Sequence, residues 1–207
     1  MQYADEIVLW RAIKNNEDCK ALQQDLDRLE EWCKETGLEI NPGKSQHLRI
    51  SNKTKKVEIP SGSYTINNKV ILTENEAECL GVKISSKMDW TAQVNKVTAK
   101  CRQTLYVING FFPKRYGAVT QLLFSSLVRS VADYASPCWF FSTKKLQRQL
   151  ESIQKNFSQS IRPSRADKED QSHDPDFSRY LQDLREVEWK PLWHRRYEKI
   201  LETTYKI

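Results

Sequence analysis

The spacing of apolar residues changes once along this chain, after Asp89 and Trp90, and this change limits the possible folds more than any other feature. Before it, one helical stripe lies among short runs of the kind that form β-strands. After it, apolar residues recur every three or four positions, which is the period of amphipathic helices. We therefore expect an α+β chain in which a mixed part, residues 1–87, precedes an all-helical part, residues 88–162.

The first part contains one expected helix. It begins near Glu17 or Asp18, and Gly37 follows it, a residue that helix C-caps favour because glycine adopts left-handed backbone angles readily. The stripe that marks its buried face consists of Leu22, Leu26, Leu29 and Cys33.

Short strands are expected around this helix, with Asn67-Asn68 as a hairpin turn, so that the sheet is predicted to be antiparallel. The predicted strands are Ile7–Trp10, Ser45–Ser51, Tyr64–Asn67, Lys69–Thr73 and Cys79–Ser85.

The second part is expected to contain three helices, within Val94–Ile108, Val119–Val131 and Leu146–Phe157. Residues 163–178 are rich in Pro, Ser, Asp and charge and predict a polar linker. A last helix, Tyr180–Tyr205, is expected within residues 179–207. The aromatic clusters Phe111-Phe112 and Trp139-Phe140-Phe141 could stack on bases, but they are expected to close a core, as aromatic clusters at helix ends more often do.

Positive charge is concentrated in one stretch. The chain carries a formal net charge of +6, yet residues 87–165 alone hold thirteen lysines and arginines against three acidic residues. Such a stretch is typical of a surface that binds nucleic-acid phosphates, although solvated helix faces would look the same. The five cysteines have no Cys-x-x-Cys spacing, and no apolar run approaches the roughly 18 residues of a spanning helix. We expect an intracellular protein, nuclear or cytoplasmic, without a membrane partner.

Two adjacent carboxylates, Asp5 and Glu6, precede the first apolar run. A tight turn fixes the direction of such side chains, and hard divalent cations prefer carboxylate oxygens. An ordinary acidic hairpin turn is the alternative.

Three segments resemble, in order, the palm motifs of reverse transcriptases. Tyr3-Ala4-Asp5-Glu6 resembles the Tyr-Ala-Asp-Asp signature of the catalytic hairpin, and Gly37 to Gln46 is similar to the next motif. Cys79 to Ile84 resembles the motif, usually Tyr-Leu-Gly-Val, that grips the primer terminus. The segments LVRSVADYASPCW (127–139), LESIQ (150–154) and 180–196 continue in the order found in non-LTR, LINE-type (jockey-like) retrotransposon polymerases.

This resemblance implies a partial polymerase palm at 1–87, a thumb-like helical region at 88–162, and partners that are an RNA template and a DNA primer. It implies that Asp5 and Glu6 bind Mg²⁺ as catalytic residues. Lys44 would protonate departing pyrophosphate or contact phosphate, unless it is a solvated turn lysine. The primer grip would be Leu80, Gly81 and Val82, and the nucleic-acid-binding residues would be Lys96, Lys100, Arg102, Lys114 and Arg115.

Two departures from the family pattern limit the expected activity. Glu6 stands where the family usually has Asp, and no other carboxylate lies in a strand pattern beside Asp5. A two-metal site needs carboxylates from more than one strand, which the family supplies from an aspartate on an earlier strand. The chain is therefore expected to be the C-terminal portion of such a polymerase, beginning at its catalytic hairpin, and inactive alone. The alternatives are a non-catalytic nucleic-acid-binding module and a protein-interaction module in which a partner completes the sheet.

Overall fold

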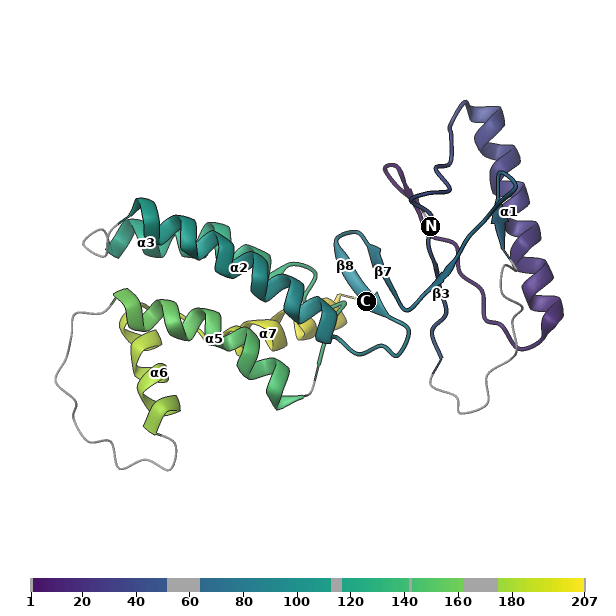
Figure 1. Ribbon diagram of the computed structural model, residues 1–207. Coiled ribbons are helices and arrows are strands. Elements are labelled where there is room, and N and C mark those ends of the chain that lie inside the picture. Colours follow the sequence, from purple (N-terminus) through teal and green to yellow (C-terminus); the bar gives the residue numbers. More distant parts are fainter. Residues whose placement is uncertain (1, 52–63, 113–116, 142, 162–174, 207) are drawn as a thin grey trace. The chain divides into compact units, whose positions relative to one another are not determined.

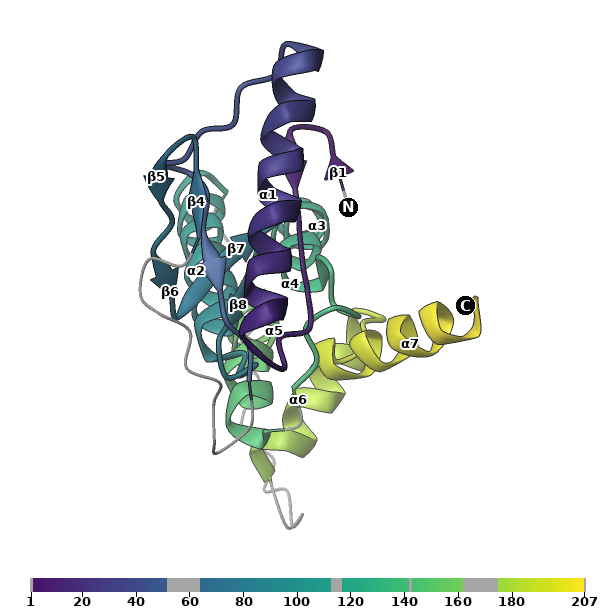
Figure 2. The same ribbon diagram turned by 90° about the vertical axis from the view of Figure 1, so that its right-hand side faces the viewer.

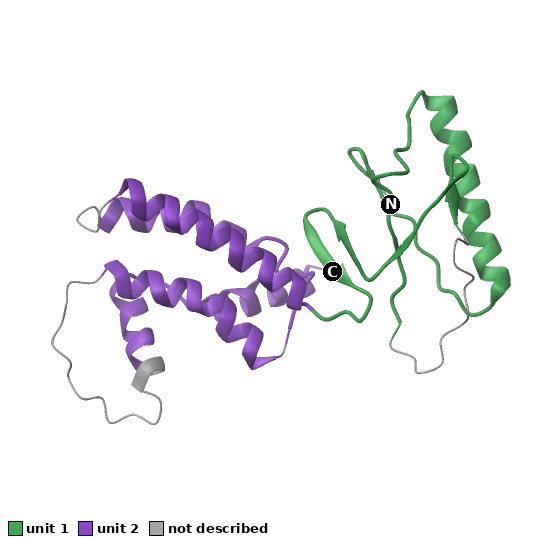
Figure 3. Cartoon of the chain, in the orientation of Figure 1, with its two compact units in different colours: residues 1–89 green, residues 90–207 purple. Residues whose placement is uncertain are grey.

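The computed structural model describes residues 2–51, 64–112, 117–141, 143–161 and 175–206 (Figure 1). The chain divides into two compact units, Met1–Asp89 and Trp90–Ile207 (Figure 3). Mixed helix and strand occupy the first unit and helices the second, so the α+β class is observed. In the described part of the chain, no helix is long and apolar enough to cross a membrane.

Helix α1, Asn16–Thr36, is the only helix among the described residues of unit 1, and its ends are set by local sequence. The Asn15 side chain accepts a hydrogen bond from the Asp18 backbone N–H, and the Asp18 carboxylate accepts one from the Asn15 N–H at 3.1 Å, which is a complete capping box. Gly37 ends the helix with a left-handed φ of 71°, as the sequence predicts.

The strands of unit 1 are short and form separate pairs. They are β1 (Gln2–Tyr3), β2 (Glu6–Ile7), β3 (His47–Leu48), β4 (Thr65–Ile66), β5 (Lys69–Val70), β6 (Thr73–Glu74), β7 (Glu76–Cys79) and β8 (Val82–Ser85). The pairs β1–β2, β4–β5 and β7–β8 are antiparallel, and Asn67-Asn68 forms the β4–β5 turn with positive φ at both residues, as predicted.

The prediction of one antiparallel sheet was wrong for β3, which pairs with β6 in parallel. The chain between Leu48 and Thr73 is long enough for a parallel crossover, which needs about a dozen residues or more. Of the predicted strand Ile7–Trp10, only Ile7 lies in a strand, as the last residue of β2. Trp10 is 80% exposed.

Apolar residues from α1 and the β4–β5 region form the core of unit 1. Helix α1 lies alongside β4 (Figure 2). Tyr64, Ile66 and Ile71 are buried there, and Leu22 and Leu26 of α1 pack against them. A two-stranded pair is barely stable by itself, so packing against a helix is what allows β4–β5 to persist.

Unit 2 is a bundle of helices: α2 (Thr91–Phe111), α3 (Gly117–Leu123), the π-helical segment η2 (Phe124–Val128), α4 (Arg129–Asp133), α5 (Lys144–Ile161), α6 (Pro175–Glu186) and α7 (Leu192–Tyr205). Its core contains a stack of three rings, in which Phe124 lies 4.3 Å from Phe157 and 5.0 Å from Trp189 between ring centroids. The η2 segment joins α3 to α4, and its residues Phe124 and Val128 are fully buried. The helical path therefore covers the core without a gap at this junction.

The predicted last helix is divided in two, α6 and α7. Pro191 has no N–H and disfavours helical geometry at Lys190 before it, so one continuous helix cannot pass this point without a break. The predicted linker, 163–178, lies outside the described residues up to 174, and its end belongs to α6.

Candidate functional site

The β1–β2 hairpin presents the two predicted carboxylates differently. Tyr3 pairs with Glu6, so Ala4 and Asp5 form the turn, and Ala4 has a positive φ of 51°. Asp5 is exposed at this turn, and its carboxylate makes no hydrogen bond or ion pair in the described part of the chain. It is therefore available to a ligand.

The Glu6 carboxylate is already engaged. Its Oε2 accepts a hydrogen bond from the backbone N–H of Leu80 at 3.0 Å, across 74 positions of sequence. Glu6 lies in β2, whose strand geometry sends its side chain to the opposite face from its neighbours. The hydrogen bond joins the predicted catalytic hairpin to the predicted primer-grip hairpin within unit 1.

Two of the predicted primer-grip residues, Leu80 and Gly81, form the turn between β7 and β8, and the third, Val82, begins β8. Leu80 (φ 47°) and Gly81 (φ 77°) both have positive φ, the geometry of a type I′ two-residue hairpin turn. Leu80 is half-buried, Gly81 is exposed and Val82 is buried. A glycine suits the second position because a left-handed backbone costs it little.

Lys44 lies in a turn after α1, and the described residues give it no hydrogen bond or ion pair to the residues of these two hairpins. It lies in a turn where the Asn41 carbonyl oxygen accepts hydrogen bonds from the backbone N–H groups of Lys44 and Ser45. Its side chain is exposed, and the described residues include no ion pair between Lys44 and Asp5 or Glu6. The predicted catalytic role of Lys44 thus has no geometric support in unit 1.

The carboxylates do not fit a complete divalent-metal site. Among the described residues, no group of three His, Cys, Asp or Glu side chains lies close enough together to hold a metal ion. Asp5 offers two free oxygens, while one Glu6 oxygen is occupied by Leu80. Mg²⁺ demands six oxygen ligands, so Asp5 would hold it only together with oxygens from outside these residues.

The predicted nucleic-acid-binding residues of unit 2 do not share one face. Lys96 and Lys100 of α2 are four residues apart and point the same way, whereas Arg102 lies about 200° around the helix from Lys100. Lys114 and Arg115 lie outside the described residues.

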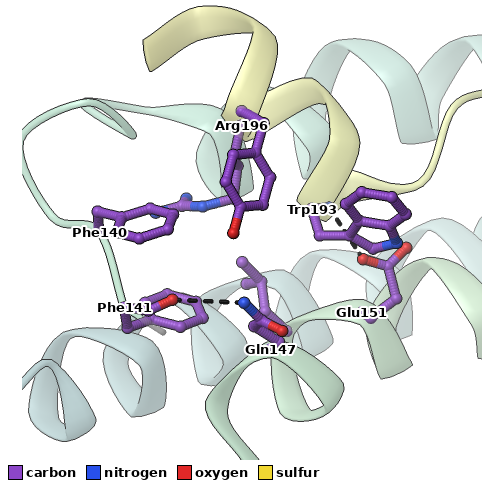
Figure 4. Close-up of a pocket in the computed structure, with 8 residues that line it drawn as sticks. Phe140, Phe141, Gln147, Glu151, Trp193 and Arg196 are labelled. Atoms are coloured by element: carbon purple, nitrogen blue, oxygen red, sulfur yellow. Dashed lines mark hydrogen bonds between the residues drawn. The ribbon is translucent and has the colours of Figure 1, made fainter. Parts of the chain in front are cut away.

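A second cluster in unit 2 contains exposed rings, of which Trp193 and Tyr197 were not predicted from the sequence. Trp139 and Phe141 are buried, as the core prediction requires, but Phe140 is 39% exposed and Phe111 is 77% exposed. Phe140 meets Tyr197 of α7 edge-to-face at 5.4 Å, and Trp193 meets Tyr197 at 6.2 Å, between ring centroids. Phe140 and Trp193 are labelled in Figure 4. The four-residue spacing of Trp193 and Tyr197 on one helix was the available signal.

Polar contacts between α5, α6 and α7 hold this cluster in place. Glu151 accepts hydrogen bonds from the backbone N–H groups of Leu192 at 2.9 Å and Trp193 at 3.1 Å, and from the Tyr180 hydroxyl. Burial raises the pKa of Glu151 even though these donors favour the carboxylate.

Arg196 lies beside the same rings. Its guanidinium is 3.9 Å from the centroid of Trp139 and donates to the carbonyl oxygens of Trp139 at 2.7 Å and Ala132 at 3.1 Å. Burial lowers the pKa of Arg196 to about 10, so it stays protonated at neutral pH.

The fold and this geometry define a two-unit α+β protein with paired hairpins in one unit and an aromatic cluster in the other. No protein-family model matches the chain, and neither the curated proteins nor the solved structures contain a significant match.

Proposed function

We propose that this chain is part of an RNA-directed DNA polymerase of a LINE-type, non-LTR retrotransposon. One observation supports this most strongly, namely the hydrogen bond between Glu6 and the Leu80 backbone. The two segments that it joins are those whose sequences resemble the catalytic hairpin and the primer grip. Residues 1–87 would be the partial palm and the helices of unit 2 the thumb-like region.

In this proposal, Asp5 contributes a metal-binding carboxylate and the Leu80-Gly81 turn contacts the primer end of an RNA·DNA duplex. Mg²⁺ would neutralise charge on the reacting phosphates when bound. Glu6 positions the primer-grip turn and is not the main metal ligand, because one of its oxygens accepts the Leu80 N–H. Catalysis by this chain alone is not expected, since Asp5 has no carboxylate neighbours that complete the site in the described part of the chain.

A recessed primer end tests the proposal directly. We expect the full chain to bind an oligo(dT)·poly(rA) hybrid with recessed 3′ ends more tightly than a blunt hybrid of the same length, measured by fluorescence anisotropy. Leu80→Ala should remove this preference. The matched control is Leu72→Ala, since Leu72 is 70% exposed elsewhere in unit 1. Equal binding of recessed and blunt hybrids by the unsubstituted chain would refute a primer-grip role.

Deoxynucleotide incorporation tests the expected inactivity. With Mg²⁺, the same hybrid and high protein concentration, no primer extension by the chain alone is expected. Robust extension that Asp5→Asn abolishes would show that the site is complete without further carboxylates.

A specific observation also favours the protein-interaction module as a second candidate. Leu9 and Trp10 follow β2 as exposed apolar residues, and Val70 of β5 is 54% exposed. The edges of two-stranded pairs, where they carry exposed apolar side chains, attract a further strand or a partner surface. This candidate predicts concentration-dependent self-association in sedimentation velocity, which Trp10→Ser should reduce. A monomer at all concentrations with a single cooperative unfolding transition would count against it.

A further inference from the structure

Three rings are exposed together on unit 2, and the polymerase proposal gives them no role. They are Phe140, Trp193 and Tyr197, each between 39% and 42% exposed. Edge-to-face ring contacts connect Phe140 to Tyr197 and Tyr197 to Trp193, so the three rings form one surface, here called the ring platform. Figure 4 shows Phe140 and Trp193 on opposite sides of a hollow, with Arg196 behind.

The platform is rigid because buried contacts hold both segments that carry it. Glu151 of α5 binds the first backbone N–H groups of α7, which fixes Trp193. Arg196 binds the Trp139 carbonyl oxygen one residue before Phe140. Rings held in this way can accept a stacked partner without first losing conformational entropy.

Positive charge lies beside the ring platform. Gln147 and Glu151 of α5 line the hollow, and Lys144 and Arg148 each precede one of them by three residues, which places them one turn away on the same side of the helix. Lys144 and Arg148 make no ion pair in the described part of the chain.

The nearby acidic groups are all engaged within unit 2. Glu198 pairs with Lys190 and His194, and Asp133 pairs with Arg195 and Lys199. Glu151 is hydrogen-bonded and partly buried. The unpaired charge beside the rings is therefore positive, and a ligand for this surface is expected to be an anion.

The size of the hollow decides between two kinds of anionic partner. It has room for about 10 Å³, hardly one water molecule. Protein partners usually anchor a large side chain in a desolvated pocket, and this hollow cannot take one. Nucleic-acid bases need no pocket, because they stack flat on exposed rings while their phosphates meet lysine and arginine.

We propose that the ring platform, with Lys144 and Arg148, is a binding site for single-stranded nucleic acid. Bases stack on Phe140, Trp193 and Tyr197, and the two cations contact the phosphates that follow. A duplex binds less well because its bases are already stacked and paired. This inference rests on unit 2 alone and does not depend on the polymerase proposal for unit 1.

Binding of the full chain to a fluorescein-labelled oligouridylate tests the site by anisotropy. Tyr197→Ala is expected to weaken binding roughly 5- to 150-fold, the range for losing one stacked base. Tyr197→Phe keeps the ring and is expected to retain the affinity. The matched control is Tyr106→Ala, because Tyr106 is an 83% exposed ring on α2, away from the platform residues in sequence.

Salt dependence tests the cations. Lys144→Gln and Arg148→Gln are each expected to reduce the slope of log affinity against log salt by about 0.7, the value for one phosphate contact on a single strand. Circular dichroism should confirm that every variant keeps its helices.

Two results would overturn the proposal. The first is equal binding by Tyr197→Ala and Tyr106→Ala. The second is tighter binding to a blunt duplex than to the single strand, which would indicate a general polyanion surface. Failure of the recessed-hybrid test on unit 1 would leave these outcomes unchanged, because Leu80→Ala does not alter the ring platform.

Discussion

The Glu6 carboxylate accepts the backbone N–H of Leu80 at 3.0 Å, so a side chain of one hairpin fixes the turn of another. A backbone N–H in a two-residue turn has few acceptors of its own, and Glu6 supplies one. Aspartate is one methylene shorter than glutamate. The glutamate at this position thus has a structural role that the aspartate of the reverse-transcriptase signature would not reach without movement of the hairpin.

Amide hydrogen exchange at Leu80 should report this contact. Glu6→Ala removes the acceptor, and exchange of the Leu80 N–H is expected to become about 2- to 12-fold faster. This range corresponds to the net free energy of one ordinary hydrogen bond. Glu6→Asp should behave similarly, while Glu6→Gln retains an acceptor oxygen and most of the protection. The measurement is exchange followed by NMR.

The neighbouring carboxylate provides the control for that experiment. Asp5→Asn alters the turn residue without touching the Leu80 contact, so Leu80 exchange should stay the same. Unchanged exchange in Glu6→Ala would show that the two hairpins do not depend on this bond.

Substituting Gly37 should destabilise unit 1 through backbone strain alone. A Cβ at Gly37 meets no atom within 4 Å, but the φ of 71° is left-handed. Gly37→Ala is therefore expected to lower the free energy of unfolding by about 1–2 kcal/mol. Gly37→Asn should cost less, because asparagine tolerates this region better. Urea unfolding followed by circular dichroism measures both.

Gly110 is a matched control with the opposite expected sign. It lies in α2 without a left-handed φ, and a Cβ there also meets nothing within 4 Å. Gly110→Ala should stabilise the chain by about 0.5–1 kcal/mol, because alanine favours helix. Equal effects of the two alanine substitutions would contradict the strain argument.

Features set by neighbouring residues could be predicted from the sequence. The end of α1 at Gly37 and the Asn67-Asn68 turn each depend on a few adjacent backbone angles, and both are as predicted. The change of period after Asp89 likewise lies at the boundary between the two units. Local chemistry is enough for such features because few other residues compete with it.

Features that depend on distant residues could not be predicted from the sequence. The parallel pairing of His47 with Thr73 and the engagement of Glu6 by Leu80 depend on contacts across long stretches of chain. The prediction that the two aromatic clusters close a core was also wrong for Phe111 and Phe140, since aromatic character identifies residues that can be buried but not whether a neighbour covers them. Trp193 and Tyr197 of the ring platform were not predicted for the same reason.

The partly buried Glu151 should give unit 2 a pH-dependent stability. Burial raises its pKa above the ordinary 4.5, so the folded chain holds this proton more tightly than the unfolded chain does. Between those two pKa values the folded state binds more protons, and this group's contribution to unfolding free energy falls as pH rises. Thermal unfolding measured from pH 4.5 upward should therefore show that Glu151 lowers the unfolding free energy as pH rises.

Glu151→Gln isolates that slope. Glutamine keeps an acceptor for the α7 backbone but does not titrate, so its unfolding free energy should lack this part of the pH dependence. Glu198→Gln is the control, since Glu198 lies on the α7 surface and its pKa is lowered by Lys190, which gives the opposite sign. The same slope in the unsubstituted chain and in Glu151→Gln would contradict a raised pKa.

Arg196 should be among the most sensitive positions of unit 2. Arg196→Met keeps much of the aliphatic bulk but leaves the carbonyl oxygens of Ala132 and Trp139 without their donor. Each unsatisfied buried group costs about 1–3 kcal/mol, so the loss of both contacts is expected to lower the unfolding free energy by roughly 2–6 kcal/mol in a urea titration. Arg102→Met, on the exposed surface of α2, should change the unfolding free energy by less than about 0.5 kcal/mol.

Because Arg196 also holds the segment that carries Phe140, near-ultraviolet circular dichroism of the folded Arg196→Met variant should change as well. Similar stability of the two methionine variants would mean that α7 does not depend on this arginine.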